Sequence, residues 1–332
     1  MSNNKPNLDS NNNINLLHDF FQNIKNFDKM DIKEIEPTTE NINEYVFEGD
    51  LNIVINELVN LIFKEINEGK SKESMKKHVI NYINYQMITL QQIYNWLLNN
   101  QDTSNSIYLF GYLNYHGIGT NSNKQKAIEL CQKAAELENI VAQIDIANMH
   151  IYGKNIDNDY NLAFQLSEKL AKEEYASGIN NLGYCYNNGI GTDLNEQKAF
   201  ELYQKAADLG NSAGIKNLGQ CYFKGIGTAV NKQKAFELFQ KAADLENSTG
   251  ISNLGWCYYK GIGTDIDKQM AFELYQKAAN FGNDTAQYNI AYMYEYGIGV
   301  KKDIDQAIYW YKKSAEQEYQ YAKNKLKVLL EK

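Results

Sequence analysis

A period of 36 residues governs the C-terminal part of the chain and constrains the fold more than any other feature. Glycines recur at this spacing, and most of them open the phrase GIGT or GIGV; they are Gly117, Gly153, Gly189, Gly225, Gly261 and Gly297. In the second copy the phrase has changed to GKNI. A fixed period of this length is typical of solenoids, in which each repeat buries its apolar face against its neighbours. The pattern therefore predicts a stack of repeats rather than separate globular domains.

Each period predicts two helices, A and B, joined by the glycine turn. Before the turn, apolar residues lie 11, 7, 4 and 3 positions ahead of the glycine and share one helical face; in the third repeat they are Gly178, Leu182, Cys185 and Tyr186. Six positions after each turn glycine comes Asn or Asp, which suits the N-cap of a helix. These caps are Asn123, Asp159, Asn195, Asn231, Asp267 and Asp303. Helix B is expected to follow each cap.

The turns should require glycine because of their backbone geometry. Gly189 and Gly191 are expected to adopt positive φ, which costs other residues about 1–2 kcal/mol. In the second repeat Asn155 replaces the second glycine, and Asn tolerates that region best. Another glycine six positions before the turn, such as Gly183, should let helix B approach closely. With only 2 prolines, both before residue 38, the fold class expected is an all-α, right-handed α-solenoid of six 36-residue helix–turn–helix repeats.

A small helical region is expected to precede the repeats. Residues 1–13 are Asn-rich and predicted to be disordered, and residues 14–104 predict about four helices, at 14–27, 50–68, 72–86 and after the cap Thr89. An acidic linker is expected at 29–49. The fourth helix lies one period before 125–136, so we interpret it as a half-repeat that begins the stack. Residues 105–332 should hold the six repeats and, from 321, a capping helix.

Composition excludes several classes of function. The net charge is -8, and all 33 basic residues are Lys, so a nucleic-acid partner is not expected. No stretch approaches 18 uninterrupted apolar residues, and the N-terminus lacks the apolar core of a signal peptide, so neither a membrane partner nor secretion is expected. The 4 cysteines, Cys131, Cys185, Cys221 and Cys257, should be buried thiols, which fits a reducing compartment and a cytoplasmic location.

The sequence contains no motif for catalysis, a metal or a cofactor. The glycine turns lack the third glycine, the preceding strand and the Lys-Ser or Lys-Thr step of a phosphate-binding loop. The 4 histidines, His18, His78, His116 and His150, have no partner at metal-ligand spacing. We therefore expect no catalytic residue, no metal site and no cofactor.

A second stripe on helix A adjoins the core stripe. Eight positions before the turn stand Asn181, Asn217, Asn253 and Asn289, and five positions before it stand Tyr112, Tyr184, Gln220, Trp256 and Tyr292. Amides can bond a partner's backbone, and aromatic rings supply contact area at little entropic cost. The alternative for the Asn positions is that their amides bond the neighbouring helix, because buried amides usually find partners. Both interpretations stay open at this stage.

The repeated phrase, as in NNLGYCYNNGIGTDLNEQKAFELYQKAADLGNSAG, resembles Sel-1-like repeats, a branch of the tetratricopeptide superfamily, from about 105 to 332. In that superfamily helix A lines the concave side, so the resemblance places the second stripe in a groove. It implies a non-enzymatic scaffold or adaptor that binds a protein or peptide there. The segment INEYVFEGDLNIVINELVNLIFKEINEGK, with IYNWLLNNQ, resembles a helical segment that precedes such repeats in an expanded fungal family, which implies a signalling context.

Three alternatives to the scaffold remain. The protein could be a regulatory subunit of a kinase-type signalling enzyme that docks through residues 14–104. It could be a hydrolase, which would need a convergent nucleophile, histidine and acid that the scattered histidines do not suggest. A quality-control adaptor of the secretory pathway would need a signal sequence or anchor. The sequence does not identify the partner or the oligomeric state.

Overall fold

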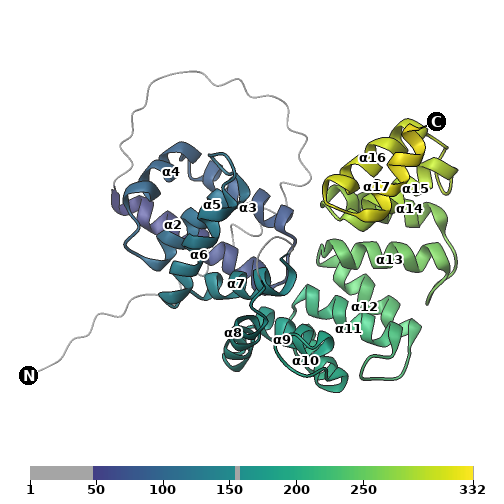
Figure 1. Ribbon diagram of the computed structural model, residues 1–332, viewed down its shortest axis with the longest axis horizontal. Helices are drawn as coiled ribbons and strands as arrows, with labels where there is room; N and C mark the ends of the chain where they lie inside the picture. The colour runs from purple at the N-terminus through teal and green to yellow at the C-terminus, as the bar shows by residue number, and fades with distance from the viewer. Residues whose placement is uncertain (1–47, 154–157, 332) are drawn as a thin grey trace, which may run out of the picture. The chain divides into compact units, whose positions relative to one another are not determined.

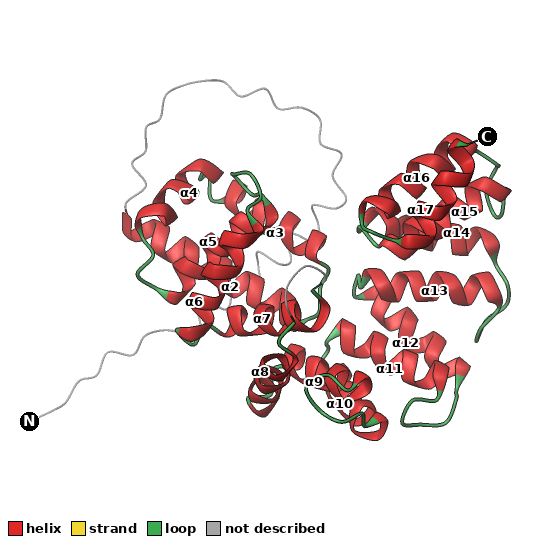
Figure 2. Ribbon diagram, in the orientation of Figure 1, coloured by secondary structure: helices red, strands yellow, loops and turns green. Residues whose placement is uncertain are grey.

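The computed structural model describes residues 48–153 and 158–331, and these residues form 16 α-helices and no strand (Figures 1 and 2). The expected tail at 1–13, the expected helix at 14–27, most of the linker and Asn155 lie outside the described residues. Within the described residues, three helices precede the repeats, namely α2 (Glu48–Asn67), α3 (Lys72–Tyr85) and α4 (Leu90–Asn99). None of the described helices combines the length and the apolar character needed to cross a membrane.

Six pairs of helices follow, each with a helix A and a helix B. The pairs are α5 (Ser104–His116) with α6 (Lys124–Glu136), α7 (Ile140–Tyr152) with α8 (Tyr160–Lys172), α9 (Ala176–Asn188) with α10 (Glu196–Asp208), α11 (Ser212–Lys224) with α12 (Lys232–Asp244), α13 (Ser248–Lys260) with α14 (Lys268–Asn280), and α15 (Asp284–Tyr296) with α16 (Ile304–Glu316). A last helix, α17 (Gln320–Leu330), packs on α16. From α5 to α17 each helix contacts the next one along the chain, which confirms the predicted all-α solenoid of six repeats.

The core is built from the stripe predicted on helix A and from alanine and aromatic residues of helix B. In the third and fourth repeats, Ala199 and Tyr203 of α10 pack with Leu218 and Cys221 of α11 in one buried cluster. Gly183 of α9 explains how closely helix B approaches, because a Cβ there would lie 3.0 Å from the ring of Tyr203. The four cysteines are buried and free, as expected.

The turn glycines terminate helix A in the left-handed conformation at five of the six positions. Gly117, Gly189, Gly225, Gly261 and Gly297 have φ between 62° and 80° and satisfy the last carbonyls of their helices. Gly153 differs: it also ends its helix, α7, but with φ −67° and ψ 130°, which is extended backbone open to any residue. The drifted phrase GKNI therefore accompanies a different conformation of the glycine that ends helix A.

The second glycine of the turn leaves less room for a side chain than the first. Gly191 has φ +66°, and a Cβ there would lie 2.2 Å from the carbonyl oxygen of Tyr160, in helix B of the preceding repeat. Gly227 and Gly299 show the same approach, at 2.3 and 2.2 Å. These turns thus pack directly on the first turn of the helix B that precedes them. Gly119 makes the corresponding approach to Leu90, so α4 lies where a helix B would precede the first repeat.

Each of the six predicted N-caps of helix B accepts a hydrogen bond from the backbone N–H three residues later, which confirms the capping pattern. Such a cap stabilises a helix by about 1 kcal/mol. Because the caps recur once per repeat, every helix B begins at the same register relative to its turn. The A helices are consequently presented in the same register from repeat to repeat.

Candidate binding groove

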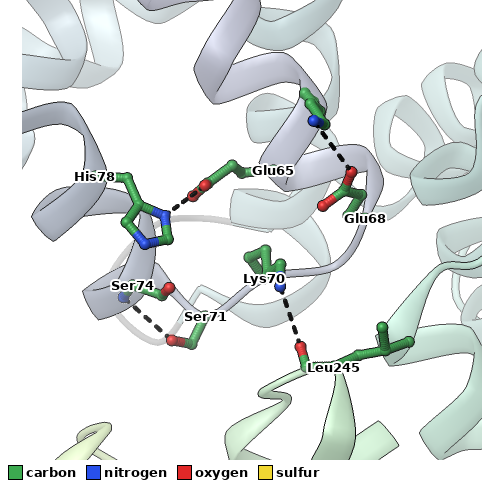
Figure 3. Close-up of polar contacts among 8 residues, drawn as sticks. Glu65, Glu68, Lys70, Ser71, Ser74, His78 and Leu245 are labelled. Carbon is green, nitrogen blue, oxygen red and sulfur yellow. Dashed lines mark hydrogen bonds and ion pairs between the residues drawn. The ribbon is translucent and has the colours of Figure 1, made fainter. Parts of the chain in front are cut away.

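The chain's own helices α2 and α3 cover the A helices of the first repeats. Helix α2 contacts α5, α7 and α9. The loop after α2 continues to the start of α11, where the backbone N–H of Ser212 donates to the carbonyl of Glu68 at 2.9 Å and its hydroxyl to the carbonyl of Gly69 at 2.7 Å. Figure 3 shows Lys70 of the same loop reaching the carbonyl of Leu245 at 3.5 Å. The carboxyl end of α2 therefore meets the amino ends of α9 and α11, an arrangement that helix dipoles favour.

This cover changes the setting of Tyr112, the first of the predicted groove residues. Tyr112 is only 5% exposed and lines a partly open cavity together with residues of α2 and α3. Tyr184, two repeats later, is half-buried and stacks edge-on against Tyr152, with ring centroids 4.8 Å apart. The A-helix surface of the early repeats is thus occupied from within the chain.

The A helices α11, α13 and α15 instead carry two open hollows that share Trp256. One hollow, of about 200 Å³, is lined by Gln220, Phe223, Lys224, Phe239, Asn253 and Trp256. The other, of about 220 Å³, is lined by Trp256, Tyr259, Lys260, Tyr275, Tyr288, Asn289, Tyr292 and Met293. We call this surface the candidate groove. Five predicted residues meet in it: Gln220, Asn253, Trp256, Asn289 and Tyr292.

Trp256 is the exposed aromatic anchor of the candidate groove. Its side chain is 42% exposed and stacks on Tyr259, with ring centroids 5.9 Å apart and planes 12° apart. The ammonium group of Lys260 lies 4.9 Å from the Trp256 ring centroid, and that of Lys268 lies 3.5 Å from the Tyr259 centroid. An exposed indole bordered by apolar hollows is typical of a surface that buries it against a partner.

The Asn positions of the second stripe divide into two groups. Asn181 and Asn217 are buried, and their amides donate to Asn148 at 2.9 Å and Asn180 at 2.8 Å in the preceding helix A. For these two, the structure favours the alternative left open above, contact between neighbouring repeats. In Asn253 the amide nitrogen Nδ2 is buried without a hydrogen-bond partner and lies at the first hollow. An unsatisfied buried amide is costly, and an incoming acceptor would relieve that cost.

A second set of Asn residues, which the sequence reasoning missed, caps the A helices. Asn139, Asn211, Asn247 and Asn283 each accept from a backbone N–H of their own helix. The remaining amide hydrogens are free to bond elsewhere: Asn211 donates to the carbonyl of Asn67 at 2.8 Å, on the covering loop. The signal was present in the sequence, because these positions also recur with the 36-residue period.

Burial shifts the pKa values of two cysteines and one histidine. Burial raises the pKa of Cys185 to about 11 and that of Cys221 to about 12, so both stay as thiols. Burial, with Lys72 and Lys76 nearby, lowers the pKa of His116 to about 4. Over residues 48–153 and 158–331, no three His, Cys, Asp or Glu side chains come together in a way that could hold a metal ion.

Comparison with known proteins places the repeats in a recognised class. The Sel1 repeat profile matches residues 104–139, 140–175, 176–211, 212–247, 249–283 and 284–319. Each match but the fifth, which starts one residue into α13, begins with the first residue of a helix A in the structure. A search of curated proteins returned no match.

Several solved structures are similar. A Sel1 repeat protein from Oxalobacter formigenes is 26% identical, with a TM-score of 0.54; the alignment covers 69% of this chain and 93% of that one. The protective antigen c5321 of uropathogenic Escherichia coli, which displays an SLR fold, is 27% identical over 74% of this chain, with a TM-score of 0.47. The alignment spans 52% of c5321, about half its length. Immunity protein Pa5087 from Pseudomonas aeruginosa is 22% identical, with coverages of 55% and 67% and a TM-score of 0.43.

Proposed function

Because the chain belongs to the Sel1 repeat family, whose members are generally protein-interaction scaffolds, we propose that it is an adaptor that binds a protein or peptide in the candidate groove. The main observation behind the proposal is the position of Trp256. It stands 42% exposed between two hollows, and the unpartnered amide of Asn253 lies in one of them. A partner segment would bury the indole and offer a backbone carbonyl to that amide.

The charges around the groove favour an acidic partner. Lys224 and Lys260 line the two hollows, and both are exposed. Glu295, near the carboxyl end of α15, is engaged by Lys325 at 3.1 Å and does not offset them. A segment with an apolar or aromatic residue for the hollows and flanking carboxylates for these lysines fits this surface best. Because exposed charges are screened, its binding should weaken as salt rises.

The cellular setting is part of the same proposal. Four buried free cysteines support a reducing, cytoplasmic location. The fungal subfamily and the signalling context rest on the resemblance of the segments around α2 and α4. Docking of a signalling enzyme through residues 14–104 is less favoured, because α2 and the loop after it already contact α9 and α11.

The decisive experiment compares two aromatic substitutions in an affinity pulldown with quantitative mass spectrometry. Trp256→Ala removes the proposed anchor, and Tyr309→Ala removes a 50% exposed aromatic from helix B of the last repeat. Loss of a hot-spot Trp costs about 2 kcal/mol, which corresponds to roughly 30-fold weaker binding. We expect partners that are depleted by Trp256→Ala and retained by Tyr309→Ala. Equal recovery with both variants, each of them folded by circular dichroism, would refute the groove.

A further inference from the structure

A partly open cavity, separate from the candidate groove, lies between α3 and the first two repeats. Its volume is about 490 Å³, within the range of ~300–1,000 Å³ typical of small-molecule sites. Helices α2, α3, α5, α6 and α7 supply its walls, and the lining residues that matter below are Lys72, Tyr108, Tyr112, Tyr115, Asp145 and Tyr152. The candidate groove shares none of these residues.

Asp145 places a carboxylate in this cavity, although the link between neighbouring repeats does not require a charged group. It stands eight positions before the turn, where four other repeats have Asn, and its Oδ2 accepts a hydrogen bond from Tyr108 at 2.8 Å. Asn217 makes the equivalent link to Asn180, also at 2.8 Å. An Asn at 145 could also accept the bond from Tyr108. Burial of the carboxyl raises the pKa of Asp145, so the charge is held at a cost that the link between repeats does not require.

Tyr112 supplies a second polar group that points to a ligand. Its side chain is 5% exposed and lines the cavity, and its hydroxyl has no hydrogen-bond partner. A buried hydroxyl left unpaired is uncommon, because the lost hydrogen bonds to water cost about 1–3 kcal/mol. A ligand with a polar hydrogen would satisfy both this oxygen and the carboxylate.

The walls of the cavity favour positive charge. The rings of Tyr108, Tyr112, Tyr115 and Tyr152 line it, and aromatic faces attract cations. His116 also lines it and stays neutral above its pKa of about 4. Lys72 is the cation of the lining; its ammonium lies 5.5 Å from the Tyr115 ring centroid, and its side chain is exposed. Solvent screens its charge more than it screens that of Asp145, although Lys72 still lowers the pKa of that carboxyl.

We propose that this cavity binds a small organic amine, with its ammonium group on the carboxylate of Asp145 and the hydroxyl of Tyr112. The ammonium donates to both oxygens, and the tyrosine rings surround its charge. The apolar part of the amine lies against Met75, Met149 and Ile66, which also line the cavity. The site is independent of the protein-binding groove, so either assignment stands without the other.

The test measures binding of phenethylamine to the full chain by calorimetry and by ligand-observed NMR, with 2-phenylethanol as the uncharged analogue of the same shape and phenylacetate as the anionic one. We expect the amine to bind at least 10-fold more tightly than the alcohol, because hydrogen bonds between charged groups are the stronger ones. Equal affinities for the amine and the alcohol would overturn the proposal. Tighter binding of phenylacetate, through Lys72, would overturn it as well, as would no detectable binding of phenethylamine.

Two substitutions assign the effect to the proposed groups. Asp145→Asn keeps the acceptor for Tyr108 and removes the charge, so the preference for amine over alcohol should vanish while the melting temperature holds or rises. Tyr112→Phe removes only the unpaired hydroxyl and should weaken amine binding several-fold in a chain at least as stable. Unchanged amine binding in both variants would overturn the assignment. If Asp145→Asn fails to fold, Tyr112→Phe alone decides.

Discussion

Replacing Gly227 by alanine should disrupt the stack far more than replacing Gly210, although both glycines have positive φ. Gly227 has φ +61°, and a Cβ there would lie 2.3 Å from the carbonyl oxygen of Glu196. Gly210 has φ +82° and no atom within 4 Å of a Cβ. The positions equivalent to Gly210 show that side chains are accepted there, since Glu138, Glu174, Glu246 and Glu318 all have positive φ. Comparing the two variants thus distinguishes the cost of positive φ from the cost of a steric clash between repeats.

The magnitudes follow from these two contributions. Left-handed backbone costs a residue with a Cβ about 1–2 kcal/mol, so Gly210→Ala should lose about 1 kcal/mol. Gly227→Ala adds an overlap with backbone of α10, and overpacking costs about 1–3 kcal/mol more. We therefore expect a total loss of about 3 kcal/mol for Gly227→Ala. Backbone atoms cannot move aside as a flexible side chain can, so the third and fourth repeats must separate slightly.

Urea unfolding followed by circular dichroism measures the two losses, and amide hydrogen exchange localises them. Repeat arrays can unfold in segments, so exchange of the α10 and α11 amides gives the local loss of stability in these two helices. Gly227→Ala should speed exchange in both helices, whereas Gly210→Ala should leave α11 nearly unchanged. Equal losses of stability in the two variants would refute the argument that the second turn glycine is required by contact between repeats.

Three further predictions concern single side chains. Asn195→Ala should lose about 1 kcal/mol of stability in urea unfolding, because it removes the cap of α10, whereas Asn195→Asp should keep most of it. Gly69→Ala should loosen α2 and α3 from the repeats, because Gly69 has φ +73° and a Cβ there would lie 2.9 Å from the backbone nitrogen of Ala213. Limited proteolysis should then cleave α2 and α3 faster, and an unchanged cleavage pattern would contradict the docking of this loop. His116 has a pKa of about 4 in the folded chain against 6.5 for a free histidine, so its contribution to stability is present above pH 6.5 and is lost as the pH falls towards 4. Thermal melts of the wild type and of His116→Gln should therefore converge as the pH falls through that window, and parallel curves would refute the shift.

The periodic features of the fold could be predicted because each depends on its own repeat and the next. The caps such as Asn195 and the core residues such as Cys221 recur with the same neighbours, so one pattern predicts one role. Gly153 shows where this reasoning ends: it keeps the glycine but lacks the GIGT phrase, and its backbone is extended.

The candidate site was less predictable, because neighbours outside the pattern decide what each side chain does. Asn181 and Asn217 meet an amide oxygen in the preceding helix A, but Asn253 does not, although all three occupy the same position. Tyr112 and Trp256 also share one position, and only Tyr112 lies in the cavity that α2 and α3 help to line. The contacts that hold this cover join residues near 69 to residues near 212, a separation that no local periodicity reveals.

Site-specific photo-crosslinking tests the binding groove most directly. A benzophenone amino acid is placed at Gln220 or Tyr292, one in each hollow, and at Tyr309 on helix B as the control. The groove account predicts that positions 220 and 292 crosslink to the same protein in cells and that position 309 does not. Crosslinking of that protein from position 309 alone, or equally from all three positions, would contradict it.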